Sequence, residues 1–334
     1  MACNNEPKQS EQEYRSFEGK TMGTYYRVTY ADSLNRDFAK AIDQLLIDIN
    51  NEVSTYIPTS TISQFNQTQS ALDITGKIHF IKNLQGALKV YNQSNGAFDP
   101  TVMPLVNYWG FGYTEKKPVT QVDSVKIDSL IQLVGADKIQ LEQTGNQTVL
   151  KKSEPGVQID FSGIATGYAL DTIGRFLEYK GVKNYLADIG GEQRARGVNP
   201  KGKIWTIGIN IPEETAAKTA ILNTVELKDW TISTSGNYRN FYEVNGVKYS
   251  HTINPKTGFP ERNTLLSATV FAAECIDADA WATAFMVMGI DKAFDSAEQN
   301  RDVEAYFIYS DPADGSMQVK FTSGLKHLFE NSRE

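Results

Sequence analysis

The chain has 334 residues, of which 40% are hydrophobic and 22% are charged, a composition typical of a folded globular protein. Its formal net charge is −7. This acidic balance argues against a nucleic-acid partner, because nucleic-acid binding needs a basic surface. The sequence contains no apolar run near the roughly 18 residues that a transmembrane helix needs.

Residues 1–16 show no hydrophobic periodicity, and they are predicted to form a disordered tether. Within it, Ala2 and Cys3 are followed by a polar spacer, which resembles the junction left when a bacterial lipoprotein leader is cut before its lipidated cysteine. This pattern predicts a lipoprotein on the periplasmic face of the bacterial cell envelope, with membrane anchoring by a lipid on Cys3. The alternative is an incidental cysteine in an unstructured terminus.

The first half of the chain is predicted to be mainly helical. Apolar residues at three- and four-residue spacing predict helices over 36–53 and 77–94, the second of them closed by Gly96. Segment 54–66 lacks a single period and is predicted to be an ordered loop with a short turn, and segment 96–113, rich in Gly, Pro and aromatic residues, is predicted to be a loop. The remaining elements predicted here are helices over 123–134 and 162–181, and strands over 137–142, 147–151 and 157–161.

The second half is predicted to be mostly β-structure, interrupted by a helix over 276–289 and a short helix after it, and closed by a helix near 322–330. The predicted strands are 184–189, 192–197, 204–210, 221–227, 230–234, 238–243, 265–272 and 303–309. Long helices among many short, antiparallel strands indicate the α+β class.

Two residues of the helix over 276–289 can bind a cation. Asp279 and Thr283 are four residues apart, so their side chains share one helical face. A carboxylate and a hydroxyl beside backbone carbonyls suit Mg²⁺ better than Zn²⁺. The alternative is structural: Thr283 bonds a carbonyl one turn back, and Asp279 favours the helix dipole.

His251 is the candidate for acid–base chemistry. It precedes the turn Asn254-Pro255-Lys256-Thr257-Gly258. A histidine beside a Mg²⁺ site is the minimum apparatus for phosphoryl chemistry. The alternative is a histidine that only makes a structural hydrogen bond. The glycine-rich segments 160–167 and 188–192 are weaker signals, because many such junctions are glycine-rich for packing alone.

Taken together, these segments resemble the FAD:protein FMN transferases, the flavin transferases of the ApbE type. The resemblance runs from about residue 17 to 330, so 17–334 is assigned as a flavin transferase domain. It is carried by Thr21-Met22-Gly23-Thr24, Ser54-Thr55-Tyr56, Ile62-Ser63-Gln64-Phe65-Asn66, Gly96-Ala97-Phe98-Asp99-Pro100-Thr101-Val102, Trp109-Gly110-Phe111-Gly112, Asp160–Gly167, Ile189-Gly190-Gly191-Glu192, Thr234-Ser235-Gly236-Asn237-Tyr238, His251–Gly258 and Ala278–Thr283.

The resemblance implies a two-lobed, T-fold-like architecture with flavin in the cleft between the lobes. It implies Mg²⁺ held by the Asp279 carboxylate, the Thr283 hydroxyl and main-chain oxygens of Gly163 and Ala282. The residues implied to surround FAD are Met22, Tyr56, Ala97, Phe98, Asp99, Asp160, Thr166 and Ile253.

The implied reaction is Mg²⁺-dependent transfer of FMN from FAD to a Ser or Thr hydroxyl of a partner flavoprotein, which releases AMP. His251 is the expected general base. Two alternatives stay open: an FAD pyrophosphatase that uses water as the acceptor, and a flavin-binding module without catalysis.

The chain departs from the family pattern at two positions. Many relatives carry Lys where this chain has Thr166, so a phosphate-facing charge is expected to be missing. Many carry Asp where this chain has Asn254, and its loss is expected to weaken the orientation of His251 or the surroundings of the ion. Both departures leave the rate and the metal affinity open.

Overall fold

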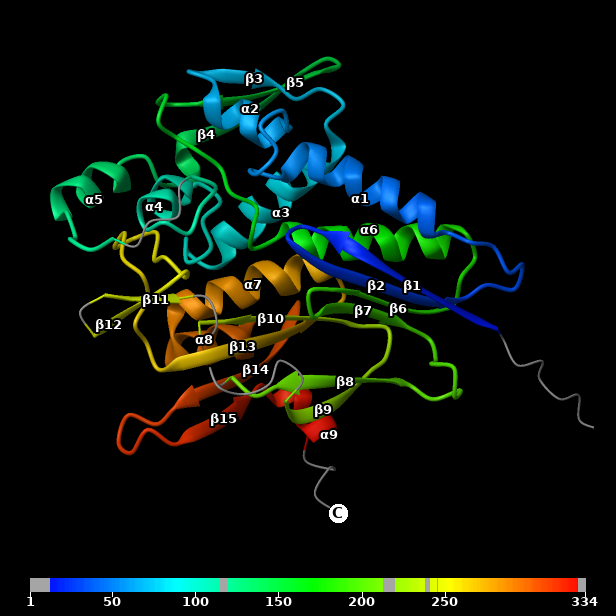
Figure 1. The fold of residues 1–334 in the computed structure, drawn as a ribbon. Helices are drawn as coiled ribbons and strands as arrows, with labels where there is room; N and C mark the ends of the chain where they lie inside the picture. The colour runs from blue at the N-terminus through cyan, green and yellow to red at the C-terminus, as the bar shows by residue number, and fades with distance from the viewer. Residues whose placement is uncertain (1–12, 115–118, 213–219, 238–240, 245, 330–334) are drawn as a thin grey trace, which may run out of the picture.

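The computed structural model describes residues 13–114, 119–212, 220–237, 241–244 and 246–329 (Figure 1). Its centre is an eight-stranded sheet with the order β1-β2-β6-β7-β10-β13-β14-β15, in which every neighbouring pair is antiparallel. The strands are β1 (Tyr14–Thr21), β2 (Thr24–Ala31), β6 (Asn184–Ile189), β7 (Glu192–Arg196), β10 (Thr231–Gly236), β13 (Leu265–Ala272), β14 (Val303–Ser310) and β15 (Met317–Phe321). Helices accompany this antiparallel sheet, which confirms the α+β class.

Strand β1 corrects the predicted end of the N-terminal tether. Residues 14–16 were assigned to the tether, but the strand begins at Tyr14, whose hydroxyl donates to the carbonyl of Val198 at 2.6 Å. Phe17 packs edge-on against the rings of Tyr26 and Tyr30 in β2. The hairpin forms through these cross-strand contacts, which a scan for helical periodicity does not detect. Residues 1–12 of the predicted tether, including Cys3, lie outside the described residues.

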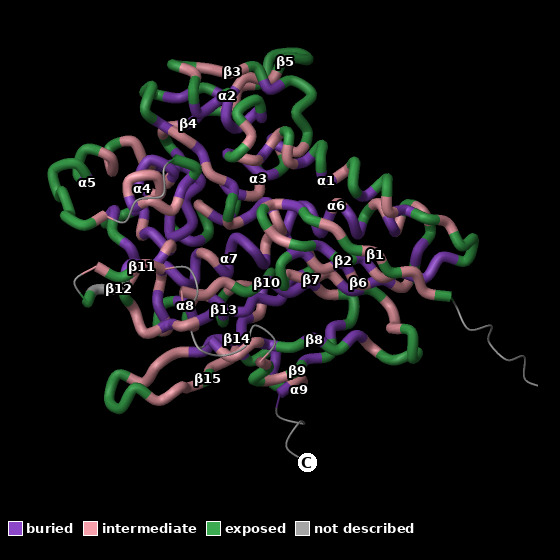
Figure 2. The backbone as a smooth tube through the Cα atoms, in the orientation of Figure 1, coloured by how far each residue is buried: buried purple, intermediate pink, exposed green. Residues whose placement is uncertain are grey.

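Two layers of helices cover one face of the sheet (Figure 1). Helices α6 (Ala165–Tyr179) and α7 (Cys275–Met288) lie against the strands, and α1 (Ala39–Val53) and α3 (Ile78–Gln93) pack outside them. Figure 2 shows α7 buried between the sheet and the outer helices. Ten of the 14 residues of α7 are buried, as expected for a helix that is apolar all round.

A buried carboxylate on α6 holds the start of α7. The Asp171 side chain accepts hydrogen bonds from the backbone amides of Cys275, at 2.8 Å, and Ile276, at 2.9 Å. Arg194 on β7 donates to the same carboxylate at 2.6 Å. Asp171 thereby satisfies two amides that the helix itself leaves without partners. This contact fixes where α7 begins.

Two smaller groups of elements pack around their own buried side chains beside the sheet. One closes its opposite face around Trp205, Phe271 and Phe329, and another packs around Trp109. The helices and strands not yet named, which include those of both groups, are α2 (Thr61–Gln67), β3 (Ala71–Asp73), α4 (Met103–Tyr108), α5 (Ser124–Ile131), η1 (Ala136–Lys138), β4 (Ile139–Thr144), β5 (Gln147–Lys152), β8 (Trp205–Asn210), β9 (Ile221–Leu227), β11 (Phe241–Val244), β12 (Val247–Ser250), α8 (Ile290–Gln299), η2 (Ser323–Leu325) and α9 (Lys326–Phe329).

The predicted strand over 157–161 is wrong. This segment makes only one isolated bridge, Val102 with Gln158. The side chain of Asn66 instead takes the place of a neighbouring strand: it accepts from the amide of Ile159 at 2.7 Å and donates to the carbonyl of the same residue at 2.9 Å. Lys152 donates to the Val157 carbonyl at 2.8 Å. Side chains therefore hold the segment extended without a sheet.

Other differences concern short elements. Residues 61–67 and 103–108 form helices within segments predicted as loops, and the first of them is capped by the Ser60 hydroxyl. The predicted closing helix is a 3₁₀ turn followed by α9. Residues 238–240 of the predicted strand 238–243 lie outside the described residues. Within the part of the chain that is described, no helix has the length and apolar character to cross a bilayer.

Gly167 is the point of closest approach between α6 and α7, and its replacement tests this packing. A Cβ at Gly167 would lie 2.2 Å from the carbonyl oxygen of Cys275, a backbone atom that cannot turn away. We expect Gly167→Ala to lower the free energy of unfolding by about 1–3 kcal/mol, measured by urea denaturation.

The matched control for this variant is Gly86→Ala, also on a helix that faces α7. There the Cβ would meet the tip of the flexible Ile276 side chain at 2.7 Å. Alanine also favours a helix over glycine by roughly 1 kcal/mol. A change within about 1 kcal/mol is therefore expected for Gly86→Ala, and equal losses in the two variants would contradict the assigned contact.

Candidate active site

A cavity of about 320 Å³ lies beside α7. Its walls come from α7, the ends of β7 and β10, and the loops around residues 98, 161 and 253, so segments far apart in the sequence meet here. The residues that line it are Tyr56, Ala97, Phe98, Asp99, Val102, Val106, Phe111, Asp160, Ser162, Gly163, Glu192, Ser235, His251, Thr252, Ile253, Pro255, Asp279, Thr283 and Val287. We refer to it as the acidic cavity, because four carboxylates line it.

A second cavity, of about 600 Å³, adjoins the first and shares Tyr56 and Ser162 with it. Its other lining residues are Met22, Gly23, Asn50, Val53, Ser54, Thr55, Ile57, Phe161, Ala165 and Thr166. No charged side chain is among them, so we refer to it as the neutral cavity. Tyr56 is 63% exposed and stands between the two cavities.

The structure therefore divides the predicted site residues between two adjoining spaces. Met22 and Thr166 line the neutral cavity, and Tyr56 lines both. The acidic cavity brings together Ala97, Phe98, Asp99, Asp160, Gly163, His251, Ile253, Asp279 and Thr283. Ala282 lines neither cavity, because it is fully buried inside α7.

Asp279 is buried at the contact between α6 and α7. Its side chain is held in place by the backbone amide of Gly167, which donates to Oδ2 at 3.0 Å. Burial raises the pKa of Asp279 to about 7, and this hydrogen bond opposes the rise. A carboxylate with one amide partner in so dry a place retains oxygen lone pairs that a cation could use.

Thr283, one turn further along α7, meets Gly163 at the turn before α6. A Cβ at Gly163 would lie 2.7 Å from the Thr283 hydroxyl oxygen, so only glycine leaves this approach open. Ser235 on β10 lies 3.5 Å from the same hydroxyl, oxygen to oxygen. The spacing of Asp279 and Thr283 predicted that they share a helical face, and both do line the acidic cavity.

Two more carboxylates are oriented by the loops that carry them. Asp99 accepts from the amide of Thr101 at 2.8 Å and from its hydroxyl at 2.6 Å, and that hydroxyl accepts from the Gly135 amide at 2.7 Å. Asp160 accepts from the amide and the hydroxyl of Ser162 at 2.9 and 2.7 Å. Burial raises the pKa of both carboxyl groups. The loops thus present acids whose positions are already fixed.

His251 follows β12 directly and faces the acidic cavity, where its ring lies 6.4 Å from that of Phe111. The turn after it is closed by Asn254, whose side-chain oxygen accepts from the amides of Lys256, at 2.8 Å, and Thr257, at 3.2 Å. The Asn254 amide group donates to Glu261 at 2.5 Å. This residue therefore shapes the turn that carries His251.

Glu192 is a cavity residue that the sequence did not single out as part of the site. The sequence places it in a glycine-rich turn and in one motif of the family resemblance, without a role of its own. It lines the acidic cavity, and burial together with the nearby Asp279 carboxylate raises its pKa well above the usual range. The signal in the sequence was a charged residue that directly follows a glycine pair, at the start of a strand. Without knowledge of the residues around it in the fold, this signal is weak.

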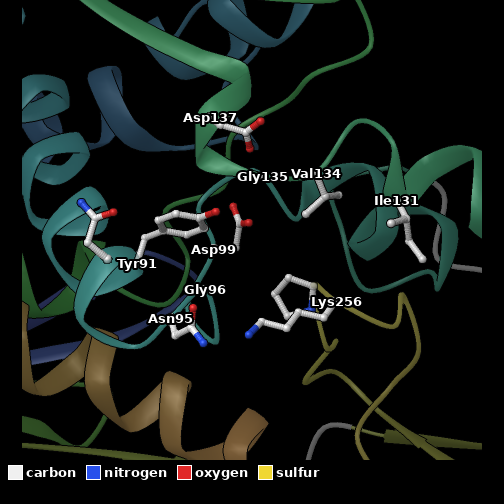
Figure 3. Close-up of a pocket in the computed structure, with 11 residues that line it drawn as sticks. Tyr91, Asn95, Gly96, Asp99, Ile131, Val134, Gly135, Asp137 and Lys256 are labelled. Carbon is white, nitrogen blue, oxygen red and sulfur yellow. The ribbon is translucent and has the colours of Figure 1, made fainter.

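A third cavity, of about 390 Å³, borders the acidic one and shares Asp99 and Pro255 with it. Figure 3 shows Tyr91 approaching it from the last turn of α3, Asp99 from the loop after that helix, and Lys256 from the opposite side. Lys256 belongs to the turn after His251 and does not line the acidic cavity.

The charge of the acidic cavity is strongly one-sided. Its lining contains Asp99, Asp160, Glu192 and Asp279 but, among the residues described, no lysine or arginine. Within the described ranges, no group of three or more His, Cys, Asp or Glu side chains is placed to hold a metal ion. A cation here would therefore need hydroxyl and main-chain oxygens as well as carboxylates, as Mg²⁺ and Ca²⁺ accept.

The fold, an antiparallel sheet covered by α6 and α7, is shared with solved flavin transferases. The chain belongs to the ApbE family, whose family model matches residues 22–307. It is 38% identical to the FAD:protein FMN transferase of Haemophilus influenzae, over 96% of this chain and 93% of the relative.

Solved structures agree with this assignment. The flavin transferase ApbE from Vibrio cholerae matches with a TM-score of 0.83 and 33% identity, over 95% of this chain and 99% of that one. The apo form of the Pseudomonas stutzeri flavinyl transferase ApbE matches with a TM-score of 0.83 and 31% identity, over 95% and 97%.

Proposed function

We propose that this protein transfers FMN from FAD to a Ser or Thr hydroxyl of an acceptor flavoprotein and releases AMP. Three relatives that carry the name FAD:protein FMN transferase match 85–96% of the chain. The observation that carries the proposal is the pairing of a neutral and an acidic cavity around Tyr56. FAD likewise joins uncharged rings to a charged diphosphate.

The proposed reaction is a substitution at phosphorus. The acceptor hydroxyl oxygen attacks the phosphorus on the FMN side of the diphosphate and forms a new phosphoester bond. The bond from this phosphorus to the bridging oxygen breaks, and AMP leaves with that oxygen. The hydroxyl proton passes to His251, which faces the cavity where the diphosphate is proposed to lie. The residues that line the two cavities bind FAD and orient its diphosphate, and His251 accepts the proton.

Mg²⁺ is proposed as the cofactor, and the residues present fit it. The side chains of Asp279 and Thr283 and the main chain of Gly163 meet in one cavity, and all offer hard oxygen ligands. The carbonyl of Ala282 is the fourth ligand that the family implies. A bound Mg²⁺ would neutralise charge on the diphosphate, which no lysine or arginine among the described lining residues can do.

Transfer, hydrolysis and simple binding are separated by one assay. Purified protein is incubated with FAD and Mg²⁺, and AMP release is measured with and without a candidate acceptor flavoprotein. Release that depends on the acceptor, together with covalent FMN on it, supports the proposal. Equal release without the acceptor would instead identify a pyrophosphatase, and no release in either sample a binding module.

In the same assay, Asp279→Ala is expected to reduce FMN transfer at least about 100-fold, because it removes the charged ligand of the proposed cation. The matched control is Asp277→Ala, which removes a carboxylate from the same helix. Asp277 pairs with Lys89 at 2.9 Å and lines neither cavity. Transfer by Asp279→Ala at the rate of the control would rule out the metal assignment.

His251→Ala is expected to reduce the transfer rate by about 10²–10⁴ while FAD affinity changes little, because the imidazole acts in the transition state. Transfer and FAD binding are measured separately. The controls are His79→Ala and His327→Ala, since His79 bonds the Tyr168 hydroxyl at 2.8 Å and His327 lies in α9. Near-normal transfer in His251→Ala, or equal losses in all three variants, would show a structural histidine.

We propose in addition that the native protein is a bacterial envelope lipoprotein, lipidated on Cys3. The support is the Ala2-Cys3 pair followed by a polar spacer. In the native host, the full-length gene product should take up radiolabelled palmitate and fractionate with the membrane, and a Cys3→Ser variant should do neither. An unlabelled wild-type protein in the cytoplasm would contradict the proposal.

A further inference from the structure

We propose that Glu192 is a second acidic ligand of the divalent cation, in addition to Asp279. Helix α7 and the ends of the neighbouring strands β7 and β10 then hold the ion from two sides. The inference rests on the proposed function, which places a cation at Asp279. It extends that site to residues on the sheet. Its basis is the position of Glu192, its buried Oε2 atom without a hydrogen-bond partner, and the oxygen atoms around it.

A tight hairpin delivers Glu192 to the cavity. Strands β6 and β7 pair up to Ile189 and Glu192, which leaves Gly190 and Gly191 as the whole turn. Their φ angles are +63° and +104°, a conformation that glycine adopts without strain. The first residue after the turn is therefore Glu192, at the sheet end that lines the acidic cavity.

The same strand provides an internal comparison. Alternate residues of a strand share a face, so Glu192 and Arg194 project to the same side of β7. Arg194 neutralises the buried Asp171 carboxylate at 2.6 Å. Glu192 Oε2 is also buried, yet among the described residues it has no hydrogen-bond partner. Burying a carboxylate without a positive charge beside it is costly, and a bound cation would offset that cost.

Hydroxyl groups on β10 complete a set of hard oxygen atoms. The register that pairs Ile232 with Gln193 brings Ser233 alongside Glu192. Ser233 Oγ is buried beside the Glu192 carboxylate, and its hydroxyl opposes the rise in the pKa of that group. Ser235, two residues further on the same face, reaches the Thr283 hydroxyl. Ligand oxygens thus run from β7 across β10 to α7.

The proposed ligand set suits Mg²⁺. This ion typically binds one or two protein carboxylates and keeps several waters. Two carboxylates, from Asp279 and Glu192, neutralise its charge before FAD binds. The strand and the helix come from distant parts of the sequence, so the site exists only when α7 is seated on the sheet.

The test is isothermal titration of Mg²⁺ into the protein without FAD. Glu192→Gln keeps the shape of the side chain but removes the charge, and it is expected to weaken Mg²⁺ binding at least about 10-fold. The matched control is Asp277→Asn, which removes the same charge from an exposed ion pair with Lys89 and should bind within about twofold of wild type. The Mg²⁺-induced rise in melting temperature, recorded on the same samples, should shrink in parallel.

A second variant covers the case in which Glu192→Gln does not fold. Glu192→Asp keeps the charge on a shorter side chain, and it should bind Mg²⁺ more weakly than wild type. Unchanged Mg²⁺ affinity in the folded Glu192 variants would overturn the proposal. If Asp279→Asn still abolishes Mg²⁺ binding in that case, the proposed function stands and only the role of Glu192 fails. If the wild type binds no Mg²⁺ while FMN transfer proceeds, the metal assignment itself is wrong.

Discussion

The seating of α7 on α6 is the constraint on which the site depends. Asp171 accepts hydrogen bonds from the first amides of α7. Gly167 has no side chain, so the backbone of α7 can pack directly against α6 at this residue. The Gly167 amide then holds the carboxylate of Asp279. One contact thus fixes both the position of the helix and the direction of its charged side chain. A small shift of α7 would move Asp279 and Thr283 together.

The arrangement of charge follows from the same packing. Several carboxylates lie between the sheet and α7, and the largely buried guanidinium of Arg194 at their edge is already committed to Asp171. The acidic cavity is left with carboxylates that no lysine or arginine of the described residues offsets. A diphosphate could enter such a space only together with a cation, because like charges in a dry site repel strongly. Substrate binding and metal binding should therefore be coupled.

The sequence predicted the long elements and the chemistry on them, since helical spacing alone places Asp279 and Thr283 on one face. It did not predict contacts made by single side chains across the fold. The extended segment near Ile159 is held by Asn66 rather than by a strand, and nothing in the local pattern distinguishes the two. Glu192 was missed for the same reason, because its unpartnered carboxylate becomes evident only when β7 lies beside α7.

The two departures from the family pattern affect different parts of the molecule. Thr166 lines the neutral cavity, so the lysine that the resemblance implies at this position would add a charge to a lining that has none among the described residues. Asn254 turns its side chain into its own loop and donates to Glu261. An aspartate at this position would face the Glu261 carboxylate, and the two acids would repel each other unless one were protonated. The asparagine therefore matches its neighbour, and the turn that carries His251 keeps its shape without the family's carboxylate.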